Sequence, residues 1–468
     1  MTERLKLSRD FQAALKKFAE ELASEDDFFV LSHHDADGIT SCAITVDLLR
    51  SLGRSVHFSC MKQIDSATVD SIRKHEGKTL ILTDFGSGHH TLLAEHGIKD
   101  YFVIDHHPPE HEYHRQINPH YFGISGGSDI SGAGMAYLVA KALGRQAMAH
   151  LAVVGAVGDM QDSKGALESV NRTILDDAVK NGTILVENDI RMFGRQSRPL
   201  TQMLAYSSEP IIPGLSGNPA ACSQFIESLG ISLSEGGVSR SYVELTAAER
   251  EKFTTAIYIR LLDVNTPEFI IQGMFGEVYT LLKEQQKTEL RDAKEFATVL
   301  NACGRQEQPD IGVNVCLGDR GEHLHKARNL LEKHRRLLAE GIEYLTEAGV
   351  EEDSHLSFFD AGAKIRESLI GVIAGMGYGA GIIPPTKPVL AFADDGNDSK
   401  FMKVSARATW ALVRGGIHLG NAMNSCSKRI GGEGGGHNIA AGARIPKEKK
   451  AKFIKCVNET FKNQVSGK

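Results

Sequence analysis

Short apolar runs alternate with amphipathic stretches in the first third of the chain. We predict strands at four of the apolar runs, residues 28–31, 56–60, 79–83 and 101–104. The spacing of apolar residues predicts helices between them over 39–52 and 66–75. Strands that alternate with helices in this way form a parallel sheet covered on both faces. In such sheets a ligand site lies at the carboxyl ends of the strands.

The pattern changes in the middle of the chain and returns to α/β near its end. Helical stretches predominate from about residue 191 to 345, with helices predicted over 247–262, 275–300 and 323–345. After His355 we predict strands at 356–359, 389–393 and 401–405 and a helix at 367–376. The expected fold class is α/β in three parts: a parallel-sheet domain (1–190), a mostly helical inserted region (191–345) and a smaller α/β domain (346–468).

Composition excludes several classes of protein. The 468 residues are 41% hydrophobic and 24% charged, as in ordinary globular proteins. Because no apolar run reaches the roughly 20 residues that span a bilayer, we expect no membrane segment. Residues 1–26 are typical of a charged amphipathic helix and not of a secretion signal. The seven cysteines form no C-x-x-C pair, which argues for reduced thiols in the cytoplasm and against a zinc site or a disulfide framework.

The net charge of −6 is unevenly distributed. Residues 400–468 hold 14 lysines and arginines against three glutamates, a net charge of +11, so the rest of the chain carries −17. We therefore expect any contact with a polyanion to be local, in the C-terminal part. A solvated lysine-rich helix at 447–462 explains the charge about equally well.

Candidate metal ligands follow the first predicted strand. His33, Asp35 and Asp37 stand on one short loop, and Gly38 allows the chain to turn into the next helix. Carboxylates and an imidazole this close together would repel one another and be poorly solvated unless a cation lies among them. This mixture of ligands favours Mn²⁺ or Mg²⁺ over Zn²⁺. The alternative is a helix-capping aspartate beside an incidental histidine.

Further candidate ligands follow other elements of the same sheet. Asp84 follows the third strand, Asp105, His106 and His107 follow the fourth, and Asp159 ends an apolar helix, where a structural cap is the alternative role. Because parallel strand ends converge, these side chains and those of the first loop should share one pocket. That set fits two metal ions about 3.5–4 Å apart, the arrangement of in-line phosphoryl displacement, with Asp84 as the bridge.

In these motifs the sequence resembles the DHH phosphoesterases. His33-x-Asp35-x-Asp37-Gly38 matches the first motif of that family, Asp84 the second, Asp105-His106-His107 the third and Asp159 the fourth. Near the C-terminus, Gly434-Gly435-Gly436-His437 and the later Ala440-Ala441-Gly442 resemble the signature of the DHH-associated domain. Arg407 resembles the phosphate-binding arginine of that domain.

The resemblance implies a role for each matched residue. His33, Asp35 and Asp84 would hold one ion, Asp37, Asp84, His106 and Asp159 a second, and His107 would polarise the scissile phosphate or donate a proton. Arg407, His437 and the three glycines (Gly434, Gly435 and Gly436) would bind substrate from a DHH-associated domain that faces the catalytic domain across a cleft. His34 is an additional imidazole that could compete with His33 as a ligand.

Within the family the chain looks most similar to archaeal RecJ-like nucleases, including the type associated with the GINS replication complex. This similarity rests on size, the helical middle region and the run from Phe193 to Pro199. It implies a two-ion exonuclease that degrades single-stranded DNA or RNA from an end in replication and repair. Two alternatives are a phosphoesterase for oligoribonucleotides, cyclic dinucleotides or phosphoadenosine phosphate, and a replication scaffold. Arg195 and Arg198 could contact nucleic acid or pair with acidic residues, and we favour pairing.

Overall fold

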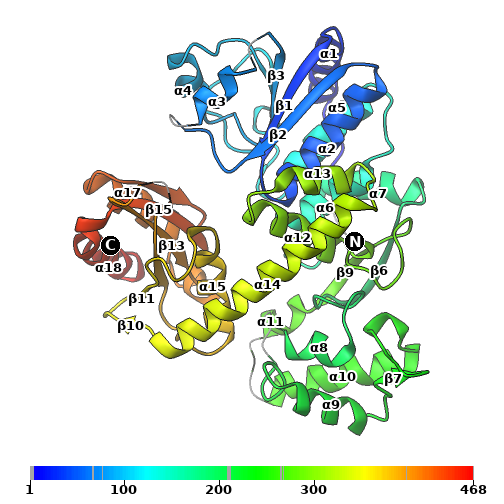
Figure 1. Ribbon diagram of the computed structural model, residues 1–468, viewed down its shortest axis with the longest axis vertical. Helices are drawn as coiled ribbons and strands as arrows, with labels where there is room; N and C mark the ends of the chain where they lie inside the picture. The colour runs from blue at the N-terminus through cyan, green and yellow to red at the C-terminus, as the bar shows by residue number, and fades with distance from the viewer. Residues whose placement is uncertain are drawn as a thin grey trace. The chain divides into compact units, whose positions relative to one another are not determined.

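A five-stranded parallel sheet forms the centre of the first of two units into which the chain divides (Figure 1). The computed structural model describes residues 5–65, 68–75, 77–207, 212–263, 266, 268–396 and 398–466. The first unit holds residues 1–207 and 212–332, and the second holds 208–211 and 333–468. In the sheet the strand order is β2 (Ser55–Met61), β1 (Asp27–His33), β3 (Thr79–Thr83), β4 (Phe102–Ile104) and β5 (Gln116–Ile117).

Alternate side chains of the central strands point to opposite faces of this sheet. Phe28, Val30 and Ile81 join the larger core, whereas Phe29 and Leu82 join a smaller core on the other face. The larger core is closed by α1 (Arg9–Ala23), α2 (Ala36–Ser51), α5 (Gly132–Ala142), α6 (Ala149–Gly158) and α7 (Ser169–Lys180). The smaller core contains residues of α3 (Val69–Arg73) and α4 (His90–Glu95).

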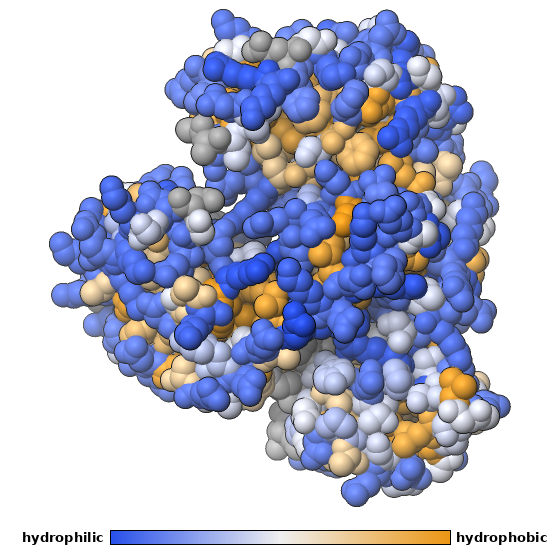
Figure 2. All heavy atoms as spheres, in the orientation of Figure 1, coloured by the Kyte–Doolittle hydropathy of each residue, from blue (hydrophilic) through white to orange (hydrophobic). Residues whose placement is uncertain are grey.

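The predicted α/β fold with a parallel sheet is therefore confirmed. The predicted helix over 66–75 is shorter, Val69–Arg73, and residues 66 and 67 lie outside the described residues. Strand β2 is at the edge of the sheet, and its apolar side chains are only partly buried. On the face shown in Figure 2, apolar side chains gather in the region of α2 and β2.

The middle of the chain has its own apolar core. That core contains residues of α8 (Leu200–Ala205), α9 (Pro219–Ser228), α10 (Ala247–Asp263) and α11 (Glu268–Gly273). A short hairpin of β7 (Ser234–Glu235) and β8 (Val238–Ser239) lies in the same region. The helical character predicted for this region is largely present.

One predicted helix of the middle region is wrong in its first part. Residues Phe275–Leu281 form strand β9, which pairs antiparallel with β6 (Ile184–Ile190). The helix begins only at α12 (Ala293–Arg305), and α13 (Pro309–Cys316) follows it. Val278, Tyr279 and Thr280 are β-branched or aromatic, and pairing with a strand some 90 residues earlier decides their conformation.

The second unit is built on a six-stranded sheet with the order β10-β11-β12-β13-β15-β14. Only β11 (Ser357–Asp360) and β12 (Val389–Asp394) pair in parallel; β10 (Glu351–Glu352), β13 (Phe401–Arg407), β14 (Glu433–Gly436) and β15 (Ala440–Pro446) pair antiparallel. One core includes α17 (Leu419–Arg429) and α18 (Lys450–Val465), and the other includes α15 (Glu367–Gly379) and the end of α14 (Glu322–Ala348). Helix α16 (Trp410–Arg414) follows β13.

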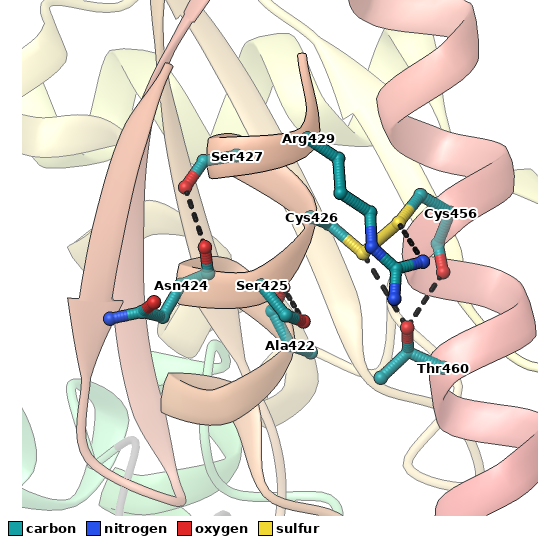
Figure 3. Close-up of a disulfide and its surroundings, with 8 residues drawn as sticks. All are labelled: Ala422, Asn424, Ser425, Cys426, Ser427, Arg429, Cys456 and Thr460. Atoms are coloured by element: carbon teal, nitrogen blue, oxygen red, sulfur yellow. Dashed lines mark hydrogen bonds between the residues drawn. A yellow bond between two sulfur atoms is a disulfide. The ribbon is translucent and has the colours of Figure 1, made fainter. Parts of the chain in front are cut away.

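The expectation that the cysteines stay reduced is wrong for one pair. Cys426 of α17 and Cys456 of α18 form a disulfide with their Cα atoms 5.8 Å apart (Figure 3). The sequence hides this pair because 30 residues separate the two cysteines and the intervening fold brings their helices together. The other five cysteines are free. Among the described residues, none of the helices combines the length and apolar character needed to cross a membrane.

Candidate metal centre

The loops after three strands of the first unit bring the predicted ligands together. His33 ends β1, Asp35 caps α2 and Asp37 lies in its first turn. Asp84 follows β3, and Asp105, His106 and His107 follow β4. Asp159 is the C-cap of α6. Groups of these residues offer ligand atoms within 4.8 Å of one another: His33 with Asp35 and Asp84; Asp37 with His106 and Asp159; and Asp84 with Asp105, His106 and His107.

The first group surrounds the side chain of His33. Its Nδ1 atom lies 3.1 Å from Asp35 Oδ2 and 3.6 Å from Asp84 Oδ2. Asp35 also accepts a hydrogen bond of 3.0 Å from the backbone N–H of Gly38, so its carboxylate both caps α2 and faces the cluster. Asp35 therefore caps the helix, as the alternative interpretation held, and also belongs to the ligand cluster.

The second group surrounds the side chain of His106. Its Nε2 atom lies 3.1 Å from Asp84 Oδ1 and 3.7 Å from Asp37 Oδ2, and its Nδ1 atom lies 4.0 Å from Asp159 Oδ2. Nδ1 also lies 2.6 Å from the carbonyl oxygen of Gly126. Because a carbonyl only accepts, Nδ1 carries the hydrogen, and the lone pair of Nε2 in the neutral ring faces Asp84.

This arrangement leaves two electron-rich atoms face to face. Asp84 is 2% exposed, and its Oδ1 atom has no hydrogen-bond partner among the described residues. A buried carboxylate oxygen opposite the lone pair of a neutral imidazole is strongly unfavourable, so either a proton on Nε2 or a metal ion must lie between them. The second oxygen of Asp84 faces His33, so the residue belongs to both groups. Carboxylates and imidazoles of this kind fit Mn²⁺ or Mg²⁺.

Backbone atoms pack closely around two of the carboxylates, those of Asp37 and Asp84, and fix their positions. The N–H groups of Gly132 and Ala133, at the start of α5, donate to Asp37 at 2.7 and 3.0 Å. A Cβ atom at Gly132 would lie 2.5 Å from Asp84 Oδ1, and one at Gly155 would lie 2.5 Å from Asp37 Oδ1. Larger residues at these two glycines would displace the carboxylates.

The electrostatics of the cluster shows that it retains protons when no metal is bound. Burial and the neighbouring charge of Asp84 raise the pKa of Asp37 well above its usual range, and burial raises the pKa of Asp159 to about 6. Burial opposes protonation of His33 and His106, but the surrounding carboxylates hold both pKa values well above the ordinary value. These are the signs of mutually repelling carboxylates that share protons with imidazoles.

Asp105 is fully buried and serves His107. Its Oδ1 atom accepts from Nδ1 of His107 at 2.9 Å, and its Oδ2 atom accepts from the N–H of Ser87 at 3.0 Å. Burial would raise the pKa of Asp105, but the hydrogen bond from His107 keeps it below the usual range. Because its oxygens are already engaged by N–H donors, Asp105 fits a positioning role better than a ligand role. The His107 side chain is 51% exposed.

Other residues support the site without having been predicted. The Oδ1 atom of Asn301 in α12 accepts from the N–H of Ala36 at 3.0 Å, and Gln161 donates to Asp159 at 2.8 Å. Ser131 caps α5, whose first N–H groups hold Asp37. The run Ser131-Gly132-Ala133-Gly134 before an apolar helix was the local signal for that cap; no local signal marks Asn301. His34 is half-buried, burial lowers its pKa to about 4, and it belongs to none of the three ligand groups.

The predicted substrate-binding residues lie in the second unit, around Ala440. Arg407 pairs in register with Ala440, and the N–H of His437 donates to the Ala440 carbonyl at 2.9 Å. The three glycines (Gly434, Gly435 and Gly436) belong to strand β14, which pairs with β15. His437 is exposed and Arg407 is half-buried. The second unit thus gathers these residues at one end of its sheet.

Arg195 is a structural residue, as favoured from the sequence. Its side chain is 2% exposed, and Nη2 lies 2.5 Å from Asp189 Oδ2. Its guanidinium also stacks near the ring of Tyr242. Arg198 lies over the rings of Phe193 and Tyr206, at 4.6 and 5.2 Å from their centroids.

Family models match three segments of the chain. Residues 27–157 match the N-terminal domain of the DHH family, residues 192–275 the DHH-CID domain and residues 384–463 the DHHA1 domain. An uncharacterized protein of Methanocaldococcus jannaschii is 28% identical over 99% of this chain and the whole of its own length.

Solved structures share the fold at low sequence identity. RecJ of Thermus thermophilus, solved with Mn²⁺ and also with Mg²⁺, superposes on 98% of this chain with a TM-score of 0.59 and 16% identity in the Mn²⁺ form. This chain spans only 55% of that RecJ chain. CDC45 of Entamoeba histolytica superposes on 97% of this chain and 98% of its own, with a TM-score of 0.61 and 13% identity. With its DHH, DHH-CID and DHHA1 domains in this order, the chain belongs to the DHH family, and it shares the fold of RecJ and CDC45.

Proposed function

We propose that this protein is a metal-dependent phosphoesterase that hydrolyses phosphodiester bonds. The observation that carries the proposal is Asp84, a buried carboxylate shared by two ligand groups, with one oxygen toward His33 and one toward His106. His33, Asp35 and Asp84 would hold one ion, and Asp37, Asp84, His106 and Asp159 the other. When bound, such ions supply Lewis-acid stabilisation of the charge that develops on the phosphoryl oxygens.

The chain's own groups provide the remaining chemistry. Asp105 fixes Nδ1 of His107, which leaves Nε2 on the half-exposed side of the ring. Burial works against protonation of His107, but Asp105 raises its pKa above the ordinary value, so the ring can carry a proton near neutral pH. His107 would donate that proton to the leaving oxygen as the phosphorus–oxygen bond breaks.

We further infer that the substrate is single-stranded DNA or RNA, shortened from an end. The DHHA1 match covers Arg407, Gly434, Gly435, Gly436 and His437, and an arginine beside a glycine-rich strand suits a phosphate. The excess of positive charge in residues 400–468 also favours a polyanion. In this proposal residues 1–190 are catalytic, residues 346–468 bind substrate, and residues 191–345 are an inserted region.

A scaffold role is the second candidate, because the chain shares its fold with CDC45. An intact set of ligands at every predicted position favours the enzyme. A link to a replication complex, with GINS as partner, remains a proposal that co-elution of the two purified components would test.

End-labelled oligonucleotides test the proposed activity. Single-stranded DNA and RNA labelled at either end are incubated with Mn²⁺ or Mg²⁺, with EDTA as one control and the Asp84→Asn variant as the other. We expect stepwise shortening that stops with EDTA and in the variant. Turnover of dinucleotides or phosphoadenosine phosphate alone would support the small-substrate alternative, and no turnover of either would leave the scaffold.

A further inference from the structure

Arg305 is a half-buried arginine beside the candidate metal centre. It lies in the last turn of α12, a helix of the region to which the sequence assigned no function. Within the described part of the chain its guanidinium makes neither a hydrogen bond nor an ion pair. Burial lowers the pKa of Arg305, and the carboxylate of Asp35 opposes that shift. None of its guanidinium nitrogens is among the buried atoms without a partner in the described residues, so the fork remains accessible from solvent and free to take an anionic ligand.

Two contacts fix this turn of α12 against the metal-binding loop. Asn301 accepts the hydrogen bond from the N–H of Ala36 at 3.0 Å. Gly304 packs so closely on the carbonyl oxygen of His34 that a Cβ atom there would overlap it. Arg305, the next residue, is therefore held beside His34 and Asp35 by the backbone. Burial, His33, Lys62 and then Arg305 lower the pKa of His34.

The following residues place this turn on one side of the cluster. Gln306, the next residue, is 6% exposed, and its amide atoms are buried without a partner among the described residues. The turn is therefore packed against the protein on the side of Gln306. Asp310, at the start of α13, lies near the backbone of Cys60 in β2, which opposes the rise that burial gives to its pKa. Helices α12 and α13 pack on α2, and α13 also packs on β2 (Figure 1). The turn thus lies at the ends of β1 and β2, whereas Asp84 and His106 follow β3 and β4.

A purely structural role explains Arg305 less well. A cation in the last turn of a helix interacts favourably with the helix dipole, but a solvated lysine or arginine does this without being buried. An arginine fork matches the oxygens of a phosphate, which a solvated cation at a helix end does not require.

We propose that Arg305 binds the substrate phosphate next to the scissile one. This inference rests on the proposed phosphodiesterase function and deepens it. The scissile phosphate lies at the cluster, and the adjacent phosphate of the same strand lies toward β2. The preferred substrate must then carry two consecutive phosphates, as an oligonucleotide does and as a dinucleoside monophosphate does not.

Three dinucleotides test the proposal. One carries only the internal phosphodiester, and the other two carry an additional 5′- or 3′-phosphate. We expect the wild-type protein with Mn²⁺ to show a kcat/KM at least about 10-fold higher for one of the two-phosphate substrates. In Arg305→Ala that ratio falls toward one, mainly through KM, and in Arg305→Lys it is intermediate. Arg336→Ala, which removes an exposed arginine paired with Glu340, keeps the wild-type ratio.

The outcomes separate this proposal from the function on which it rests. An unchanged ratio in Arg305→Ala, with an active wild-type protein, overturns the role of Arg305 alone. An equal loss on all three substrates also overturns it, because Arg305 would then support the metal loop or the scissile phosphate; Mn²⁺ affinity from calorimetry tells these two apart. A wild-type protein that cleaves neither these three substrates nor the longer end-labelled strands overturns the proposed function and this inference together.

Discussion

Asp105 accepts a hydrogen bond from Nδ1 of His107 at 2.9 Å, within one triplet of adjacent residues. Asp105 Oδ1 also accepts from the backbone N–H of His106 at 2.7 Å. The first residue of the triplet therefore orients the other two, the second faces Asp84, and the third faces outward. The two adjacent imidazoles have different roles because one is fixed by the carbonyl of Gly126 and the other by Asp105.

We expect His107→Ala to lower kcat by about 10²- to 10⁴-fold, the usual contribution of a general acid, while Mn²⁺ affinity stays near the wild-type value. His107 Nδ1 is bonded to Asp105, and the ring is half-exposed, so its loss leaves the buried carboxylates in place. Steady-state kinetics and calorimetric Mn²⁺ titration on the same preparation provide the measurement. A large loss of Mn²⁺ affinity would instead make His107 a ligand.

Asp84→Asn should abolish cleavage, with a fall of at least about 1,000-fold, because it removes a carboxylate shared by both ligand groups. Asparagine is the suitable replacement because Asp84 has a φ of +60°, which asparagine tolerates better than alanine. The metal-free variant should melt no lower than the metal-free wild type, since it relieves repulsion between carboxylates.

Addition of Mn²⁺ should raise the melting temperature of the wild type and leave that of Asp84→Asn nearly unchanged. Asp70→Asn, an exposed aspartate of α3, is the matched control and should respond as the wild type does. Near-normal Mn²⁺-dependent cleavage by Asp84→Asn would exclude the shared-ligand assignment.

The stabilisation by Mn²⁺ should grow as the pH rises. Asp37 and Asp159 have raised pKa values, that of Asp159 being about 6, and those of His33 and His106 are raised as well. The folded metal-free cluster therefore binds more protons than the unfolded chain, so its contribution to stability falls as the pH rises from about 4 past neutrality. Metal binding must displace these protons, so it strengthens over the same range.

Melting temperatures with Mn²⁺ and with EDTA, taken between about pH 5.5 and 7.5, provide the check. The difference between them should widen with pH in the wild type and in Asp70→Asn. A difference that is constant or narrows toward high pH would show that the cluster does not exchange protons for metal.

The sequence predicts this site well wherever the signal is local. His33 ends a strand, and Asp84 and Asp105 directly follow strands; short apolar runs mark all three strands. Because the carboxyl ends of parallel strands meet at one edge of the sheet, these residues come together. The features that the sequence does not reveal depend on contacts between residues far apart in the chain. Asn301 and Arg305 reach the loop of Asp35 from about 265 residues away, and β9 is a strand only because β6 lies beside it. Long-range contacts of this kind leave no periodicity in either partner.

The disulfide is also a feature that the spacing of residues does not reveal. Because of it, we expect the stability of the second unit to depend on the redox conditions. Cys426 and Cys456 join α17 to α18 across a separation of 30 residues, with Arg429 and Thr460 against the sulfur atoms (Figure 3). Closing a loop of that length restricts the unfolded chain and contributes about 2–4 kcal/mol to the free energy of unfolding.

We expect dithiothreitol, or the replacement of both cysteines by serine, to lower the free energy of unfolding of the second unit by this amount in urea titrations. Cys222→Ser, which alters a buried free thiol of the first unit, should still show the effect of dithiothreitol. If the double variant is as stable as the reduced wild type and does not respond to reductant, the whole effect of dithiothreitol comes from this disulfide. If the oxidised wild type is no more stable than the reduced wild type, the disulfide does not stabilise the second unit.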